Sequence, residues 1–168
     1  RAARPEEIAR MAQLLADALA EGGMGLSTGL VYAPAMHAQP DEIEALARVV
    51  ARHGGIYATH MRSEGGALLE AIAEAIQVAR ATGVRLQISH LKTAGEANWP
   101  KLDAAFAAIE AAQAEGLAVA SDRYPYTASC TDLDVILPTW AAQGGRAAIL
   151  ARLRNPADRA RIRAEMAA

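Results

Sequence analysis

The sequence predicts an α/β fold with parallel strands, and within that class it favours part of a (β/α)8 TIM barrel with about four βα units. Four candidate strands begin near Met24, Ile56, Val84 and Leu117, and one amphipathic helix fills each gap between them. A spacing of roughly 30 residues from strand to strand is the βαβ period, which is typical of parallel strands joined by right-handed crossovers.

Glycine placement is the second observation, and it argues against the main alternative, a doubly wound nucleotide-binding sheet. Such a sheet needs a glycine-rich turn between a strand and the following helix. Gly54-Gly55 instead precedes a strand, and Gly65-Gly66 lacks both the G-x-G-x-x-G and the Walker spacing. The ends of the chain are the third observation. The sequence starts at Arg1 rather than Met and stops at Ala168 within helical sequence, so we expect a piece of a longer protein.

The first two predicted helices have clear start and stop signals. A helix is expected over residues 5–21, because apolar residues recur at helical spacing behind a proline and two glutamates, and Gly22-Gly23 follows. The segment "MGLSTGLVYAP" then reads as a short strand leading into a loop. A second helix is expected from Pro40 to Gly54-Gly55, and the short strand "IYATH" follows it.

The same alternation continues until Ser121. It comprises a helix through "ALLEAIAEAIQVARATG", a strand "VRLQISH", a helix through "KLDAAFAAIEAAQAEG" and a strand "LAVASD". A long irregular segment, "DRYPYTASCTDLDVILPTW", comes next, and a glycine pair and two short helices complete the chain. Long loops at strand ends in α/β folds are usually functional, so this segment is a candidate for part of the site.

Composition makes several classes of function improbable. The 17 basic and 19 acidic residues give a net charge of −2, so no overall field attracts nucleic acid or an anionic membrane. The sequence contains neither an apolar run of about 18 residues nor a signal peptide, and a cytoplasmic protein is expected. The single cysteine, Cys130, excludes an internal disulfide and a metal cage made of cysteines alone.

Two histidines occupy matching places at the ends of neighbouring strands. His60 ends the second predicted strand and His90 the third, and in parallel folds chemistry collects at these carboxyl ends. A single such histidine usually just bonds a nearby carbonyl, but the matched pair favours a shared metal ion, for which two ligands are still an incomplete set. His37, in a loop, and His53, before a glycine stop, are given structural or surface roles.

Further polar residues cluster around this pair. Lys92 and Arg62 each follow a histidine by two residues, and either could hold a carboxylate or polarise a carbonyl, or could be an ordinary solvated cation. For Lys92 the functional interpretation is favoured, whereas for Arg62 a functional group and a solvated loop cation are equally good interpretations. The "YPY" segment at 124–126 offers phenols for a pocket or, alternatively, a rigid proline turn. Tyr32 is a further candidate for a pocket wall, and only proximity suggests Cys130 as a ligand.

Several ordered motifs together carry a resemblance to a known family. They are "GLSTGLVYAPAMHAQPDEI", "GGIYATHMRSE", "QISHLK" and "SDRYPYTASCTDLDVILPTWAAQGG", and the terminal "RLRNPADRARIRAEM" extends the match. Together they resemble the N-acyl-D-amino-acid deacylases, or D-aminoacylases, of the amidohydrolase superfamily. The resemblance implies a metal-dependent hydrolase barrel with a small accessory β domain, and zinc-dependent hydrolysis of the amide bond of N-acyl-D-amino acids, a C–N bond other than a peptide bond.

Residue roles follow from the resemblance for five positions. His60 and His90 correspond to two zinc ligands, and Lys92 corresponds to a lysine that binds the substrate carboxylate. Tyr124 and Tyr32 correspond to tyrosines that line the substrate pocket. The family often has a hydroxyl residue where Cys130 stands. The expected partner is therefore a small-molecule substrate, with no nucleic acid and no membrane.

The resemblance also implies what residues 1–168 lack. The family's His-x-His pair and metal-ligating cysteine have no counterpart in the sequence, and its catalytic aspartate is expected beyond Ala168. Residues 1–168 would then be the central part of the barrel domain, without its N-terminal and C-terminal parts and inactive alone. The alternatives are a dihydroorotase-like amidohydrolase acting on cyclic amides and a non-catalytic α/β binding module.

Overall fold

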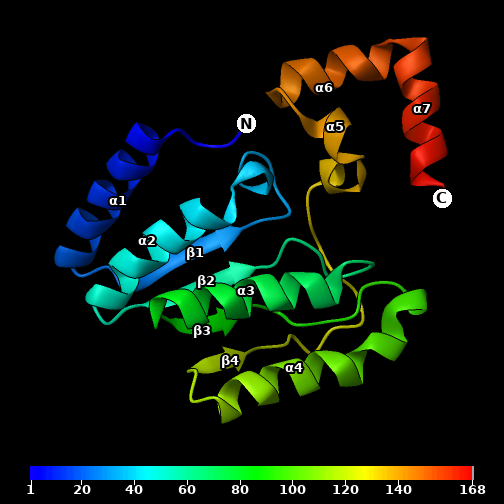
Figure 1. Ribbon diagram of the computed structural model, residues 1–168. Helices are drawn as coiled ribbons and strands as arrows, with labels where there is room; N and C mark the ends of the chain where they lie inside the picture. Colours follow the sequence, from blue (N-terminus) through cyan, green and yellow to red (C-terminus); the bar gives the residue numbers. More distant parts are fainter. Residues whose placement is uncertain (168) are drawn as a thin grey trace. The chain divides into compact units, whose positions relative to one another are not determined.

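A computed structural model describes residues 1–167, which form two compact units, residues 1–125 and the residues from 126 onward (Figure 1). The first unit alternates helices and strands in the predicted order. Its helices are α1 (Pro5–Ala20), α2 (Pro40–Arg52), α3 (Leu68–Thr82) and α4 (Leu102–Ala114), with short 3-10 helices η1 (Ala35–His37) and η2 (Glu96–Lys101). Its strands are β1 (Gly25–Gly29), β2 (Ile56–His60), β3 (Arg85–Ile88) and β4 (Val119–Ser121).

The four strands form one parallel sheet in the order β1-β2-β3-β4. Each strand therefore pairs with the next one along the chain, and a helix connects every pair. A doubly wound sheet reverses its strand order at a switch point, whereas a barrel keeps the sequential order seen here. The α/β prediction and its four parallel strands are confirmed, although β3 and β4 end before the sequence pattern suggested.

The helices cover one face of the sheet. On β2 the side chains of Tyr57 and Thr59 are buried, and their register partners Leu86 and Ile88 on β3 are buried with them. Residues that alternate with these, including His60, lie on the opposite face and are only partly buried. In a barrel the helices lie outside, so the partly buried face corresponds to the barrel interior.

The core lies between the sheet and helices α2, α3 and α4, and α1 packs against α2. Most residues of the core are aliphatic, and its alanines lie mainly on the helices. Gly83 ends α3 in the left-handed conformation (φ 70°), which suits glycine and turns the chain into β3. The best-buried large side chains are Tyr57, Met61, Leu68, Ile72, Leu86, Ile88, Val50 and Thr59.

The second unit is helical and carries the short helices that the sequence predicts after the glycine pair. It contains η3 (Leu133–Ile136), α5 (Thr139–Ala142), α6 (Gly145–Arg154) and α7 (Pro156–Met166). The Asn155 side chain accepts hydrogen bonds from two backbone N–H groups at the start of α7. Trp140 donates to Glu165 over 2.8 Å and stacks under Arg161, which joins α5 to α7. Within residues 1–167, every helix is too short or too polar to cross a bilayer.

Candidate metal centre

Four ring side chains gather at the carboxyl ends of the four strands. Tyr32 follows β1, His60 ends β2, His90 follows β3 and Tyr124 follows β4. The ring centroids of Tyr32 and His60 are 5.1 Å apart, those of His60 and His90 are 4.4 Å apart, and those of His90 and Tyr124 are 6.3 Å apart. Each strand thus contributes one ring to a row along the edge where parallel α/β folds place their chemistry.

The two histidines point one nitrogen each at a common place. His60 Nδ1 and His90 Nε2 are 2.9 Å apart. Two nitrogens that bind one tetrahedral zinc at about 2.0–2.1 Å lie about 3.3 Å from each other, so a shift of a few tenths of an ångström would fit the ion. The donor set therefore fits zinc, for which neutral imidazole is a favoured ligand.

The environment of His60 favours the protonation state that binds metal. Burial lowers the pKa of its imidazole below the ordinary value. The nearby charge of Glu64 acts in the opposite direction, and those of His90 and Lys92 act in the same direction as burial. Because only the neutral ring offers a lone pair, a lowered pKa keeps His60 competent as a ligand.

His90 reaches this place by an unusual backbone turn rather than by matched register, and this corrects the sequence interpretation. Thr59 pairs with Ile88, so the register partner of His60 is residue 89 and not His90. Strand alternation alone would direct residue 90 to the opposite face. Instead β3 ends at Ile88 and His90 adopts a left-handed φ of 42°, an uncommon conformation for a residue other than glycine that is frequent at functional sites.

Asp122, at the end of β4, holds this turn in place. Its Oδ1 accepts the backbone N–H of His90 over 2.7 Å, and its Oδ2 accepts the side-chain amide of Gln87 over 2.7 Å. The Asp122 carbonyl accepts the N–H of Leu91 over 2.9 Å. The orientation of His90 is thus set by the neighbouring strand.

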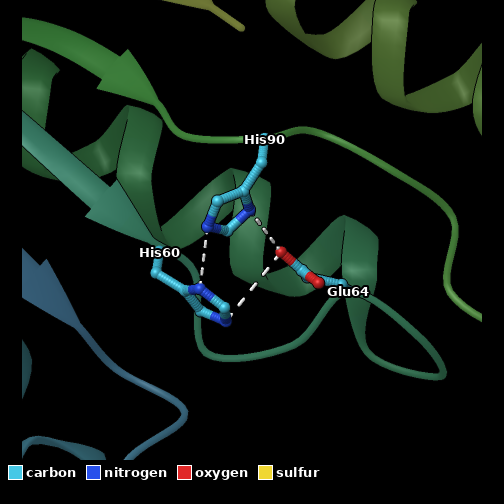
Figure 2. Close-up of side chains that lie close together, drawn as sticks. All are labelled: His60, Glu64 and His90. Atoms are coloured by element: carbon cyan, nitrogen blue, oxygen red, sulfur yellow. Dashed lines mark hydrogen bonds and ion pairs between the residues drawn. The ribbon is translucent and has the colours of Figure 1, made fainter. Parts of the chain in front are cut away.

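Glu64 is the site residue that the sequence reasoning missed. Its buried Oε1 lies 2.8 Å from His90 Nδ1 and 3.9 Å from His60 Nε2 (Figure 2). Among the described residues, these three are the group of histidine, cysteine and carboxylate side chains whose donor atoms come within 4.8 Å of one another. The signal available in the sequence was an acidic residue four positions after the histidine that ends a strand. Only the path of the loop after β2 returns the Glu64 carboxylate to the two histidines.

Lys92 joins the same cluster. Its ammonium nitrogen lies 2.5 Å from Glu64 Oε1, donates to the carbonyl of His90 over 2.7 Å and sits 5.4 Å from the centre of the Tyr124 ring. The Lys92 side chain is only 14% exposed. Lys92 therefore lies within this cluster and is not a solvated loop cation, and its role toward a substrate carboxylate stays a prediction.

The two tyrosines stand at either end of the row. Gly29 makes room for the Tyr32 ring, because a Cβ at Gly29 would lie 2.8 Å from a carbon of that ring. Arg123 packs over the ring of Tyr124, and its guanidinium carbon lies 4.2 Å from the ring centre. Both predicted pocket residues thus lie beside the histidines.

Arg62 supports the loop after β1, so the structure resolves the open choice for it in favour of a structural contact. Its guanidinium donates to both carboxylate oxygens of Glu74 on α3, over 2.9 and 2.8 Å. It also donates to the carbonyls of Met36 and Ala38, over 2.8 and 3.1 Å. These contacts fix the segment that follows Tyr32 against the helix layer.

Replacing Arg62 with alanine is expected to lower the free energy of unfolding by about 2 kcal/mol, because it leaves a partly buried carboxylate and two carbonyls without their donor. Urea denaturation of the full-length protein measures this loss. Arg80→Ala is the control, since Arg80 forms an exposed pair with Glu115 that is worth about 0.5 kcal/mol or less. Equal losses in the two variants would contradict a supporting role for Arg62.

The other two histidines of the chain lie outside this cluster. His53 follows α2, and its Nδ1 is 2.9 Å from the carbonyl of Val49. His37 ends η1. Cys130 is exposed and belongs to the second unit. The structural or surface roles of His37 and His53 stay predictions.

Comparisons with known proteins identify relatives of one kind. The chain is 42% identical over 144 residues to an N-acyl-D-glutamate deacylase from Alcaligenes xylosoxydans xylosoxydans, a match that covers 84% of this chain and 29% of the relative. It is 44% identical over 133 residues to a D-aminoacylase from the same organism, covering 79% of this chain and 27% of the relative. The chain thus spans less than a third of the curated relatives it matches. No family model matches it.

Solved structures give the same result. The N-acyl-D-glutamate deacylase of Bordetella bronchiseptica, determined with zinc and a phosphonate inhibitor, superposes with a TM-score of 0.74 at 37% identity. That match covers 75% of this chain and 27% of the other. The four-stranded unit therefore has the fold of part of an amidohydrolase barrel.

Proposed function

From its relationship in sequence and fold to the N-acyl-D-amino-acid deacylases, we propose that residues 1–168 are the central part of the barrel domain of a zinc-dependent amidohydrolase. The full-length protein hydrolyses the amide bond of N-acyl-D-amino acids. One observation carries the proposal most directly: His60 Nδ1 and His90 Nε2 converge at 2.9 Å beside the partly buried side chain of Lys92. A cation site next to a carboxylate-binding group suits a substrate that carries both an amide and a carboxylate.

His60 and His90 would hold the zinc ion together with ligands from other parts of the full-length protein. Zinc bound there supplies Lewis-acid activation of water and of the scissile carbonyl. The proton acceptor is the aspartate expected beyond Ala168, which lies outside the described residues. Acid–base catalysis is therefore assigned to a residue elsewhere in the protein, and this segment supplies metal ligands and substrate contacts.

Lys92 would bind the α-carboxylate of the substrate. An ammonium group has three N–H donors, and the Lys92 nitrogen lies within 3.0 Å of the His90 carbonyl, Glu64 Oε1 and His90 Nδ1. The substrate carboxylate would take the N–H that faces His90 Nδ1. A carboxylate held at Lys92 and an amide held at the metal fix two of the groups on the α-carbon, so the Tyr32 and Tyr124 walls can select its configuration.

The test is hydrolysis by the purified full-length protein of N-acetyl-D-glutamate, N-acetyl-D-aspartate, N-acetyl-D-leucine and the three L-enantiomers. We expect release of amino acid from D substrates only, loss of activity after dialysis against a chelator, and recovery with zinc. Zinc-loaded protein that hydrolyses a cyclic amide such as a hydantoin instead would favour the cyclic-amide alternative. Failure to hydrolyse any of these compounds would favour the binding module.

A further inference from the structure

Glu64 contacts both a metal-site histidine and the substrate-binding lysine, and the proposed function leaves its role open. Its side chain is 15% exposed and its Oε1 is buried. A carboxylate in such a place either binds the metal directly or acts on a ligand from behind. The contacts of His90 distinguish these two arrangements.

The two nitrogens of the His90 ring face different partners (Figure 2). Nε2 faces His60 at 2.9 Å, and Nδ1 faces Glu64 Oε1 at 2.8 Å. A bare Nδ1 lone pair held 2.8 Å from a carboxylate oxygen would be repulsive, whereas an Nδ1–H donates to that oxygen. Lys92 Nζ lies 3.0 Å from the same Nδ1 and can only donate, so Nδ1 has both a donor and an acceptor beside it. A metal ion held at the Nε2 lone pair would leave the ring proton on Nδ1, where Glu64 Oε1 is the acceptor at 2.8 Å.

Lys92 argues against direct ligation by Glu64. Its ammonium nitrogen lies 2.5 Å from Glu64 Oε1 and 3.0 Å from His90 Nδ1. A metal ion bound through these two atoms would have to share their lone pairs with an ammonium at contact distance, and the two cations would repel each other. A metal between His60 Nδ1 and His90 Nε2 avoids that conflict, because it lies on the other side of the His90 ring.

The backbone holds Glu64 in its position independently of the side-chain contacts. The Ser63 hydroxyl accepts the N–H groups of Gly65 and Ala67, over 3.2 and 3.3 Å, and so shapes the turn. The Glu64 carbonyl accepts the N–H of Ala94, in the loop after β3, over 2.7 Å. Two loops that hydrogen-bond to each other therefore fix the backbone from which the Glu64 carboxylate extends.

We propose that Glu64 is a positioning residue of the metal centre: it accepts the Nδ1–H of His90, which commits Nε2 to the metal, and with the same oxygen it holds the Lys92 ammonium. This inference rests on the proposed function, since it assigns a role toward the metal that His60 and His90 bind. Outer carboxylates of this kind orient a histidine ligand and raise its basicity.

The experiment compares metal binding by full-length Glu64→Ala, Glu64→Gln and His90→Ala proteins. Glu70→Gln is the matched control, because Glu70 is an exposed glutamate on the adjacent helix α3. Zinc affinity is measured by competition with a chromogenic chelator, and the visible spectrum of the cobalt-substituted proteins reports the ligand set. Long-range ¹H–¹⁵N correlation spectra of histidine-labelled protein report the His90 tautomer.

We expect Glu64→Ala to weaken zinc binding about 10- to 100-fold, with unchanged cobalt band positions and a His90 ring no longer confined to the Nδ1–H form. Glu64→Gln keeps an acceptor oxygen and is expected to lose less, about 10-fold or under. If the Glu64→Ala protein fails to fold, the inference is decided by the zinc affinity, the cobalt spectrum and the His90 tautomer of the Glu64→Gln protein. Glu70→Gln is expected to match the unmodified protein in all three measurements.

Two results would overturn the inference but leave the proposed function standing. One is unchanged zinc affinity and unchanged His90 tautomer in both Glu64 variants, while His90→Ala loses zinc. The other is a zinc loss in Glu64→Gln as large as that in His90→Ala with altered cobalt bands, which identifies Glu64 as a direct ligand. Retention of zinc by His90→Ala would instead overturn the proposed metal site, and this inference with it.

Discussion

Replacing His90 with alanine in the full-length protein is expected to weaken zinc binding about 10²–10³-fold and to remove deacylase activity in proportion. Structural zinc sites bind with about 10–16 kcal/mol over four ligands, so one ligand corresponds to about 2.5–4 kcal/mol. His90 also carries the left-handed turn that alone brings its ring to His60. Zinc content after gel filtration, and turnover of an N-acetyl-D-amino acid at rising zinc concentration, measure the two effects.

His53→Ala is the matched control for this variant. It removes the same side chain from the end of α2, where His53 contacts only the carbonyl end of its own helix among the contacts described. We expect this protein to keep both its zinc and its activity. Stoichiometric zinc and full turnover in His90→Ala would rule out the metal assignment, and activity restored by excess zinc would show that only affinity was lost.

Replacing Lys92 with methionine is expected to lower kcat/KM for N-acyl-D-amino acids about 10²-fold, chiefly by raising KM. Methionine fills much of the same volume but cannot donate, so the substrate carboxylate loses a charge-assisted hydrogen bond in a site where Lys92 is only 14% exposed. Steady-state kinetics with D substrates measure the loss. Zinc content is measured in parallel, because Lys92 also contacts Glu64 and His90.

A substrate without the carboxylate provides the control. With an N-acyl-D-amino acid amide, the methionine variant and the unmodified protein are expected to have similar kcat/KM values, because the amide offers Lys92 no anion to bind. A matching decrease for both kinds of substrate would mean that Lys92 acts on the metal centre or on the fold rather than on the carboxylate.

Much of the site could be predicted because the carboxyl ends of parallel strands lie at the same edge of the sheet. His60, Lys92 and both pocket tyrosines follow strands, so hydrophobic periodicity alone places them near one another. The structure brings the four rings into one row and places Lys92 beside His90 and Tyr124. The assignment of zinc and substrate roles to them rested on the resemblance to deacylases, since periodicity carries no information about a ligand.

Other features could not be predicted, because they depend on loop paths and not on periodicity. Glu64 follows His60 by four residues in a segment without regular structure, and only the turn at Ser63 and the bond to Ala94 return its carboxylate to the histidines. Arg62 lies two residues earlier in the same segment and points instead to Glu74 and the loop after β1. Neighbouring residues in one loop thus have opposite orientations.

Apolar periodicity was enough to establish the parallel α/β fold, the order of its elements and the edge that holds the site, because these properties are set by which residues must leave water. The contact of His90 with Glu64, the pairing of Glu64 with Lys92 and the offset of one residue between the two histidines required the folded chain. Each of them depends on hydrogen bonds between segments about 30 residues apart, such as that of Asp122 to His90, whose geometry exists only after the sheet has formed.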